Sequence, residues 1–257
     1  MNYTLITGAS SGIGAAIARR CAREGFNLIL VARTTHLLEA LAKEIEENHK
    51  VVVQVITADL LSPNAAYHLY TTCQKNKWPV RILINNAGLG LWGNFQDLSL
   101  EHMVEMMQLN QQLLVELTHF FIPMLREVPY AHILNVSSTA SFQPVPYFSV
   151  YAASKSFVLS FSRGLRKELE PYKINVSCLC PGPTESEFFS KSGFKKIDWA
   201  KGAFMKTGEV ADIAINSLLE KKAIIIPGFS NSIGAFFSKH LPSGLMAALT
   251  GKYFQPK

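Results

Sequence analysis

Short apolar runs alternate with longer segments of helical periodicity along most of the chain. An apolar run of about four to eight residues suits a buried strand, whereas apolar residues three or four apart suit a helix that covers a sheet. Strands are predicted at residues 3–7, 27–32, 51–56, 80–84, 132–136, 174–179 and 223–226. Helices are predicted at residues 15–23, 35–48, 100–125, 150–169 and 210–220, with a further helix after Ser62. Because strands and helices alternate, we predict an α/β fold of three layers, in which helices cover both faces of a doubly wound, mostly parallel sheet of seven strands.

The same alternation predicts a single domain. A chain of 257 residues, 48% of them hydrophobic, can bury such a sheet as one unit. No segment is long enough to serve as a linker between domains. We therefore expect one domain over residues 1–257, ending in a tail at 228–257 in which glycine and serine separate apolar clusters.

Cysteine and histidine patterns predict a reducing environment and no metal. The four cysteines include no C-x-x-C pair, and no two of the seven histidines stand at metal-ligand spacing. No secretory signal opens the chain, and no apolar run reaches the length of a membrane span. We expect a cytoplasmic protein that binds no metal.

Positive charge is concentrated toward the C-terminus. The net charge is +6, and residues 187–257 contribute +5 of it through ten lysines and five acidic residues. No stripe of arginine interleaved with aromatic residues accompanies these lysines, so nucleic-acid binding is not predicted. Contact with a membrane surface or an acyl carrier through this basic part stays open as an alternative.

The segment Tyr151-Ala152-Ala153-Ser154-Lys155 contains the first candidate chemistry. Residues four apart share a helix face, so Tyr151 and Lys155 point the same way. A tyrosine has an ordinary pKa of about 10 and is a weak acid or base near neutrality, but a cation beside it lowers that pKa. Ser138, at the end of a predicted strand, could hold the oxygen whose proton Tyr151 handles. Alone, the pair would be interpreted as an ordinary helix surface pair.

A glycine loop follows the first predicted strand. Gly8, Gly12 and Gly14 stand between that strand and a helix, with the spacing G-x-x-x-G-x-G. In this context backbone N–H groups and a helix N-terminus can bind phosphate. A simple turn is the alternative interpretation of the three glycines alone. Ligands of a doubly wound sheet bind at the carboxyl ends of its strands, where this loop lies.

With these pieces placed, the chain resembles the short-chain dehydrogenase/reductase family. The resemblance covers roughly residues 1–189 and is specific, because six motifs occur in the family's order and spacing. They are Thr7-Gly8-x-x-x-Gly12-x-Gly14, Asn85-Asn86-Ala87-Gly88, Asn110, Ser138, Tyr151-x-x-x-Lys155 and Pro181-Gly182. The resemblance implies a single-domain Rossmann fold, a nicotinamide cofactor, and reversible hydride transfer between that cofactor and an alcohol or carbonyl.

The resemblance also implies roles for individual residues. Tyr151 would exchange a proton with the substrate oxygen, and Ser138 would orient that oxygen. Lys155 would lower the pKa of Tyr151 and hold the nicotinamide ribose, and Asn110 would anchor a water that links Lys155 to solvent. The cofactor-binding residues would be Gly8, Ser10, Ser11, Gly12, Ile13, Gly14, Arg33, Asp59, Leu60, Asn86, Ala87, Gly88, Tyr151, Lys155, Pro181, Gly182, Thr184 and Ser186.

Arg33 favours NADP(H) over NAD(H). The second strand of such a sheet ends beside the adenosine ribose, where an acidic residue binds the 2′-hydroxyl of NAD and arginine favours the 2′-phosphate of NADP. The strand here ends Val31-Ala32-Arg33, and the next acidic residue is Glu39. We predict NADP(H) as the preferred cofactor, bound through this single arginine, with NAD(H) as the alternative.

Aromatic residues after the sixth predicted strand indicate a lipophilic substrate. Residues 190–207 occupy the place of the family's substrate lid, and lysines among them indicate an anionic handle on the substrate. The predicted substrate pocket consists of Trp92, Phe142, Tyr147 and Phe188. Acyl chains, ketoacyl thioesters and steroid-like ketones fit this pattern. The alternatives are a small polar ketone or sugar, or a cofactor-binding regulator without chemistry. A separate interpretation of these residues is that the aromatic side chains pack in a subunit interface and the lysines form a solvated face.

Two predicted helices are apolar on more than one face. A helix outside a sheet needs one apolar stripe, so a second stripe needs another cover. Since relatives pair through these two helices, we predict a homodimer or homotetramer. The residues concerned are Met106, Leu109, Leu113, Leu114, Leu117, Phe120, Phe121 and Ile122 in one helix, and Phe157, Val158, Leu159, Phe161 and Leu165 in the other.

Overall fold

A seven-stranded parallel sheet forms the centre of the computed structural model, which describes residues 1–194 and 204–256. Its order is β3-β2-β1-β4-β5-β6-β9, and every neighbouring pair is parallel. The strands are β1 (Tyr3–Thr7), β2 (Asn27–Ala32), β3 (Val53–Thr57), β4 (Val80–Asn85), β5 (His132–Val136), β6 (Asn175–Leu179) and β9 (Ile224–Ile225). The predicted doubly wound sheet of seven strands is confirmed.

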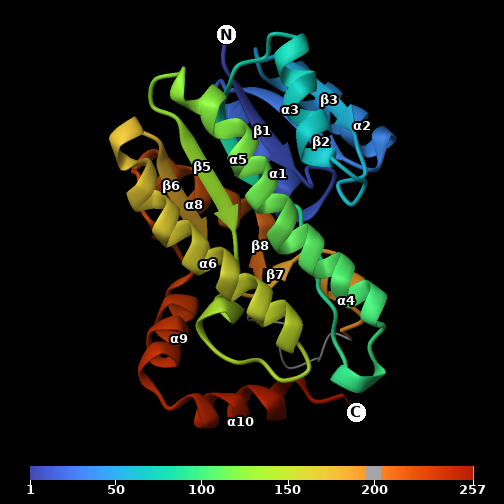
Figure 1. The fold of residues 1–257 in the computed structure, drawn as a ribbon, viewed down its shortest axis with the longest axis vertical. Coiled ribbons are helices and arrows are strands. Elements are labelled where there is room, and N and C mark those ends of the chain that lie inside the picture. The colour runs from blue at the N-terminus through green and yellow to red at the C-terminus, as the bar shows by residue number, and fades with distance from the viewer. Residues whose placement is uncertain (195–203, 257) are drawn as a thin grey trace.

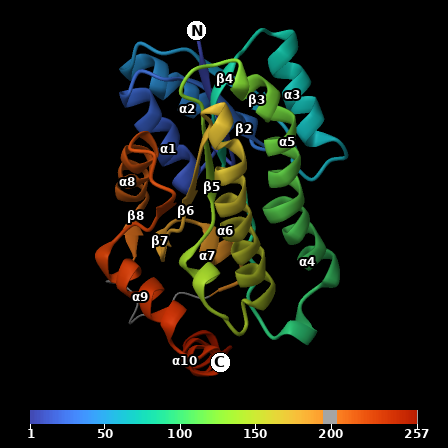
Figure 2. The ribbon, with the colours of Figure 1, turned by 60° about the vertical axis from the view of Figure 1, so that its left-hand side comes forward.

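Helices cover both faces of this sheet and complete the three predicted layers (Figures 1 and 2). One face packs against α1 (Gly12–Arg23), α2 (Thr35–Asn48) and α8 (Thr207–Leu219). The other face packs against α3 (Ala65–Lys75), α5 (Leu113–Arg126) and α6 (Ser149–Leu169). Successive strand residues alternate between the two sides, so Leu28 and Leu30 pack on the first face while Ile29 and Val31 pack on the second.

The predicted helix 100–125 consists of three consecutive pieces. These are α4 (Leu100–Met107), a π-helical turn (Gln108–Gln112) and α5. The predicted helix after Ser62 begins only at Ala65, because Asn64 adopts a left-handed conformation with φ 59° and cannot continue a helix. Single 3-10 turns lie at Phe95–Asp97, Thr139–Phe142 and Glu170–Tyr172.

The C-terminal part contains more regular structure than its sequence predicts. The tail forms two helices, α9 (Phe229–His240) and α10 (Ser243–Phe254), which lie together at one end of the molecule (Figure 1). The segment after β6 contains β7 (Thr184–Glu185), α7 (Phe188–Lys191) and β8 (Met205–Lys206), and β7 pairs with β8. Of the expected lid at 190–207, residues 195–203 lie outside the described part.

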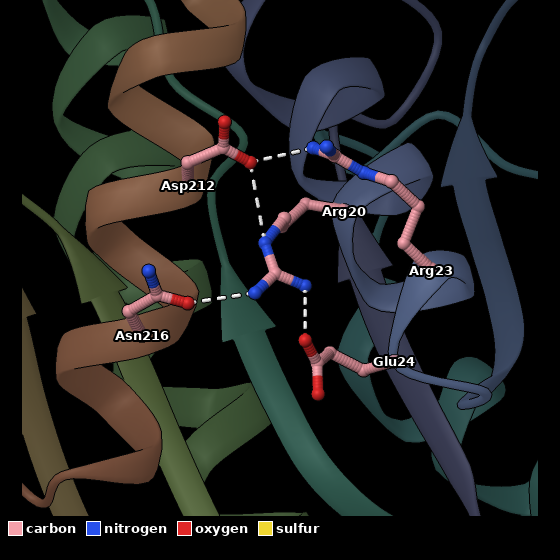
Figure 3. Close-up of polar contacts among 5 residues, drawn as sticks. All are labelled: Arg20, Arg23, Glu24, Asp212 and Asn216. Atoms are coloured by element: carbon pink, nitrogen blue, oxygen red, sulfur yellow. Dashed lines mark hydrogen bonds and ion pairs between the residues drawn. The ribbon is translucent and has the colours of Figure 1, made fainter.

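A polar cluster joins α1 to α8 on the outer side of the first helical layer (Figure 3). The guanidinium of Arg20 donates to Asn216 Oδ1 at 2.6 Å and forms ion pairs with Glu24 at 2.5 Å and Asp212 at 3.2 Å. Arg23 reaches the same Asp212 oxygen at 2.5 Å. The Arg20 side chain is only 12% exposed, and its three nitrogens each contact a different residue, two of them on α8, so it links these two helices.

Candidate active site

One cavity of about 400 Å³ opens at the carboxyl edge of the sheet. Loops that follow β1, β2, β3, β4, β5 and β6 all contribute to its lining. This is the edge at which doubly wound sheets bind ligands. The residues predicted from sequence for cofactor binding all line it: Gly8, Ser10, Ser11, Gly12, Ile13, Gly14, Arg33, Asp59, Leu60, Asn86, Ala87, Gly88, Tyr151, Lys155, Pro181, Gly182, Thr184 and Ser186.

The glycine loop is held by contacts between β1 and β4. The Asn86 side chain donates from Nδ2 to the carbonyls of Thr7 at 2.9 Å and Gly8 at 3.1 Å. A Cβ on Gly14 would lie 2.2 Å from the Gly8 carbonyl oxygen, so this position admits only glycine. Gly8 also has a positive φ of 66°, which a larger residue would adopt only with strain.

The first turn of α1 lines this cavity. Ser11 precedes the helix without forming a side-chain cap, and the first turn contains no acidic residue. Gly12, Ile13 and Gly14 of that first turn all line the cavity. A helix N-terminus without a side-chain cap can bind the pyrophosphate of a dinucleotide, and Gly12 and Gly14 leave room for it because they lack a Cβ atom. These residues therefore fit the cofactor that the motifs imply.

Arg33 and Asp59 lie at the end of the cavity formed by the loops after β2 and β3. Arg33 is exposed, and within residues 1–194 and 204–256 no carboxylate pairs with it. Asp59 accepts a hydrogen bond from the Leu61 N–H at 3.1 Å, which shapes its own loop. The guanidinium of Arg33 is therefore available to an anionic ligand in this cavity.

Tyr151, Ser138 and Lys155 meet where α6 passes the end of β5. Ser138 is hydrogen-bonded to the Tyr151 hydroxyl, and its Oγ also accepts from the Ala140 N–H at 3.1 Å. Lys155 is 5% exposed and donates from Nζ to the Val136 carbonyl at 3.0 Å. All three residues line the cavity, so the structure brings the predicted group together.

Burial controls the protonation of this group. It raises the pKa of Tyr151 to about 12, opposed by the hydrogen bond to Ser138. It also lowers the pKa of Lys155 to about 8, because the charged ammonium loses water. The expected lowering of the Tyr151 pKa by Lys155 is therefore absent from the protein alone, since Ser138, not Lys155, opposes the effect of burial.

Asn110 stands behind the cavity wall. It lies in the π-helical turn and is 2% exposed. Its Oδ1 accepts from the Leu89 N–H at 2.9 Å, and its Nδ2 donates to the Leu89 carbonyl at 2.9 Å and to Ser154 Oγ at 3.0 Å. These bonds explain an asparagine in mid-helix and tie the loop after β4 to α6, so Asn110 positions the chain around Lys155.

Aromatic residues line the other end of the cavity. Of the four residues predicted for the substrate pocket, only Phe188 lines it, with its ring 5.3 Å from that of Tyr151. Trp92 instead donates from Nε1 to the Phe254 carbonyl at 2.7 Å and packs on Phe194. Trp92 is therefore not among the residues that line this cavity, and its place in the substrate pocket stays a prediction.

Phe142 and Tyr147 also lie outside the lining of this cavity. Phe142 packs on the core cluster that includes Val158 and Leu159 of α6. Tyr147 has a left-handed φ of 67°, and its carbonyl accepts from the Gly93 N–H at 3.0 Å, so it shapes the turn before α6.

Several lining residues were not predicted from sequence. Among them are Gln143, Val145, Phe148 and Phe254. Phe148 stands three positions before Tyr151, and helical spacing could have placed it on the same face. Phe254 comes from the end of α10 and packs on Phe148 at 5.4 Å and Phe194 at 5.5 Å between ring centres. No local pattern links it to the site.

The arrangement combines a nucleotide cradle, a protonated phenol and an apolar end. Within the described residues, no group of three His, Cys, Asp or Glu side chains lies close enough to hold a metal ion. Thr184 and Ser186 complete the loop after β6, where Thr184 Oγ1 donates to the Gly182 carbonyl at 3.0 Å. A carbonyl oxygen placed at Tyr151 would receive a proton from its hydroxyl and a hydrogen bond from Ser138.

Comparisons with known proteins agree with this site. Residues 2–196 match the profile of the family described as short chain dehydrogenase. A short-chain dehydrogenase from Sphingobium yanoikuyae, solved in complex with NADPH, is 33% identical with a TM-score of 0.83 over 96% of this chain and 95% of that one. The bulky-bulky ketone specific alcohol dehydrogenase from Comamonas testosteroni is 30% identical with a TM-score of 0.78 over 96% and 94%. Sulfoacetaldehyde reductase 2 of Chromohalobacter salexigens is 38% identical over 73% of this chain and 74% of its own.

Proposed function

This chain belongs to the short-chain dehydrogenase family and is an oxidoreductase acting on alcohol or carbonyl groups, and on that premise we propose that it uses NADP(H) and a lipophilic substrate. The observation that carries this proposal is one cavity lined at one end by Arg33 and the glycine loop and at the other by phenylalanines, with the Tyr151 ring against Phe188.

The chemistry divides between the cofactor and the side chains. A bound nicotinamide would supply or accept the hydride. Tyr151 holds a proton on its hydroxyl at neutral pH, since burial raises its pKa to about 12. Ser138 is hydrogen-bonded to that hydroxyl and would orient the substrate oxygen beside it. A proton donor of this kind serves carbonyl reduction, which we propose as the favoured direction near neutral pH.

The cofactor preference rests on Arg33. Its guanidinium has no carboxylate partner in the described residues, and it lines the cavity beside Ser10 and Ser11 of the glycine loop. A 2′-phosphate there would gain a charge-assisted hydrogen bond that a 2′-hydroxyl would not. The NADPH-bound Sphingobium relative supports this choice.

The substrate preference rests on the aromatic end. Phe148, Phe188, Phe189 and Phe254 contribute apolar surface there, and bulky apolar carbonyls would bury it. The Comamonas relative described as specific for bulky-bulky ketones supports this reading. A small anionic aldehyde is the second candidate, since the Chromohalobacter relative is named for one and Lys191 lines the cavity, although it pairs with Glu187 at 2.7 Å.

A carbonyl panel tests the function. Oxidation of NADPH and NADH is followed with bulky aryl or alkyl ketones, long-chain 3-ketoacyl thioesters and small anionic aldehydes. We expect the bulky lipophilic carbonyls to have a kcat/KM at least about tenfold above that of the small aldehydes. Burying one more apolar group of side-chain size contributes enough free energy for such a ratio. A preference for the small anionic aldehydes would select the second candidate. If the protein bound the cofactor but no carbonyl compound led to its oxidation, a cofactor-binding regulator without catalytic activity would be favoured.

We also propose a homodimer or homotetramer formed through α4, α5 and α6. Part of the second apolar stripe predicted for α5 is covered within the chain, because Phe120 packs on Tyr67 and Tyr70 of α3. Val104, Met107 and Phe157 stay between 37% and 39% exposed on α4 and α6. Light scattering at micromolar concentration checks this assembly, and a monomer would contradict it.

A further inference from the structure

The two C-terminal helices expose a row of large apolar side chains. Their inner side is anchored: Ala235 is buried, and Ser238 donates from Oγ to Gln143 at 2.5 Å. On α10, Thr250 donates to the Pro144 carbonyl at 2.9 Å. The C-terminal apolar surface consists of the residues left between 38% and 82% exposed, namely Phe229, Ile233, Phe236, Phe237, Leu241, Leu245 and Leu249.

Helical spacing groups these residues into stripes. Phe229, Ile233, Phe236 and Phe237 stand at i, i+4, i+7 and i+8 and so share one face of α9. Leu245 and Leu249 stand at i and i+4 on α10. Exposed apolar side chains that form a contiguous face mark an interaction site, whereas isolated ones need no explanation.

The charge around this surface selects the partner. Residues 221–257 contain five lysines and no aspartate or glutamate. Lys252 is exposed one turn after Leu249. If two copies paired through this surface, they would bring only positive side chains of this segment together. An anionic lipid surface instead complements both the phenylalanines and the lysines.

We propose that α9 and α10 dock on the surface of an anionic lipid bilayer. None of the described helices is long and apolar enough to cross a membrane, so the two helices would lie in the plane of the interface. Phe254 at the end of α10 lines the cavity, so the docked element is also a wall of the site. This docking goes beyond the proposed function, and its measurement needs no turnover.

Vesicle co-sedimentation tests the proposal. The full chain is mixed with vesicles of phosphatidylcholine, or of phosphatidylcholine and phosphatidylglycerol in equal parts. The wild type should sediment with the anionic vesicles and weakly with the neutral ones. Phe236→Ser with Phe237→Ser should weaken binding to the anionic vesicles by at least about tenfold. Leu37→Ser, at an exposed leucine of α2, should leave binding unchanged, since α2 lies toward the opposite end of the molecule from α10 (Figure 1).

A charge variant keeps the test decisive if the double variant misfolds. Lys252→Glu should weaken binding to the anionic vesicles and leave binding to the neutral ones unchanged, whereas Lys75→Glu on α3 should change neither. Circular dichroism reports folding of each variant. Failure of the wild type to bind anionic vesicles would overturn the proposal. So would light scattering that shows the double variant dissociating a dimer, because the surface would then join two copies of this chain.

Discussion

Lys155 holds its ammonium nitrogen 5.8 Å from the centre of the Tyr151 ring and donates to the Val136 carbonyl at 3.0 Å. The two residues stand one helical turn apart on α6, and both are desolvated by the protein around them. Burial disfavours the charged form of each, so it raises the pKa of the phenol and lowers that of the amine. Tyr151 therefore keeps its proton near neutral pH, as a proton donor must. Burial of the charged Lys155 lowers the stability of the folded protein.

Replacing Lys155 should reveal that cost. The pKa of Lys155 falls from 10.5 to about 8 on folding, so the folded chain binds fewer protons between these values and its stability rises with pH there. Below about pH 8 the buried charge costs about 3 kcal/mol, taking 1.36 kcal/mol per pKa unit. Lys155→Met should therefore be more stable than wild type at pH 7, by about 1–3 kcal/mol after loss of the Val136 hydrogen bond.

Urea unfolding between pH 7 and pH 10 measures this effect. The wild type should gain stability across the interval relative to Lys155→Met, and Lys75→Met, at an exposed position, should follow the wild type. Parallel pH profiles of wild type and Lys155→Met would contradict the lowered pKa.

Tyr151→Phe should abolish most turnover and leave cofactor affinity nearly unchanged. The phenylalanine ring still packs on Phe188 and Phe148, but the exchangeable proton is gone. General acid catalysis contributes roughly 10²–10⁴-fold, so kcat should fall by at least that range. Steady-state kinetics and cofactor titration measure the two quantities, with Tyr67→Phe on α3 as the control. Near-normal turnover in Tyr151→Phe would rule out this proton donor.

Arg33→Ala should reduce the preference for NADPH over NADH by about one to two powers of ten. A charge-assisted hydrogen bond to the 2′-phosphate is worth about 1.5–3 kcal/mol, and each 1.4 kcal/mol is a factor of ten. Titration of both cofactors into wild type and variant gives the ratio. Arg163→Ala removes another exposed arginine, from α6, and should leave the ratio unchanged. An unchanged ratio in Arg33→Ala would mean that Arg33 does not contact the phosphate.

Gly14→Ala should damage the nucleotide end of the site. The new Cβ would lie 2.2 Å from the Gly8 carbonyl and 2.5 Å from Asn86 Nδ2, and backbone must shift to admit it. We expect a loss of about 1–3 kcal/mol in unfolding free energy, with at least tenfold weaker cofactor binding. Gly208→Ala in α8 meets nothing within 4 Å and should be neutral or stabilising. If Gly14→Ala and Gly208→Ala had equal unfolding free energies and equal cofactor affinities, the proposed role of the glycine loop in cofactor binding would be contradicted.

Phe254→Ala should raise KM for bulky lipophilic carbonyls by about tenfold or more, since burying a phenylalanine ring is worth about 1.5–3 kcal/mol. Small carbonyls that do not reach this wall provide the internal control, and kcat should change little because Tyr151 and Ser138 keep their contacts. A uniform loss of kcat on all substrates would instead indicate collapse of the site.

The sequence predicts most of the fold and the polar half of the site because local patterns encode them. Strand periodicity gives the seven strands, and the glycine loop, Ser138 and the Tyr151–Lys155 pair stand at strand and helix ends that a parallel sheet must bring to one edge. Asparagine is unusual inside a helix, so the sequence also marks Asn110 as a special position. The structure places it in a π-helical turn.

The apolar end of the site depends on contacts that no local pattern encodes. Trp92 and Phe254 are 162 positions apart, yet the Trp92 indole donates to the Phe254 carbonyl and Phe254 lines the cavity. The protonation states are likewise a property of burial and not of spacing. A neighbouring lysine predicts a lowered tyrosine pKa, but burial raises the pKa of Tyr151, and the hydrogen bond of Ser138 opposes burial only in part.

The ion pairs of Arg20 and Arg23 with Asp212 bear on the order in which the protein can be completed during synthesis. They join α1 to α8 across 189 positions of the chain for Arg23. Until the ribosome has released α8, α1 lacks its neighbour in the helical layer, and Arg20 and Arg23 lack Asp212, although β1 and the glycine loop are among the first segments made. The glycine loop, encoded early, is therefore fully supported only late, and a chain that ends before α8 would expose the side of α1 that faces α8.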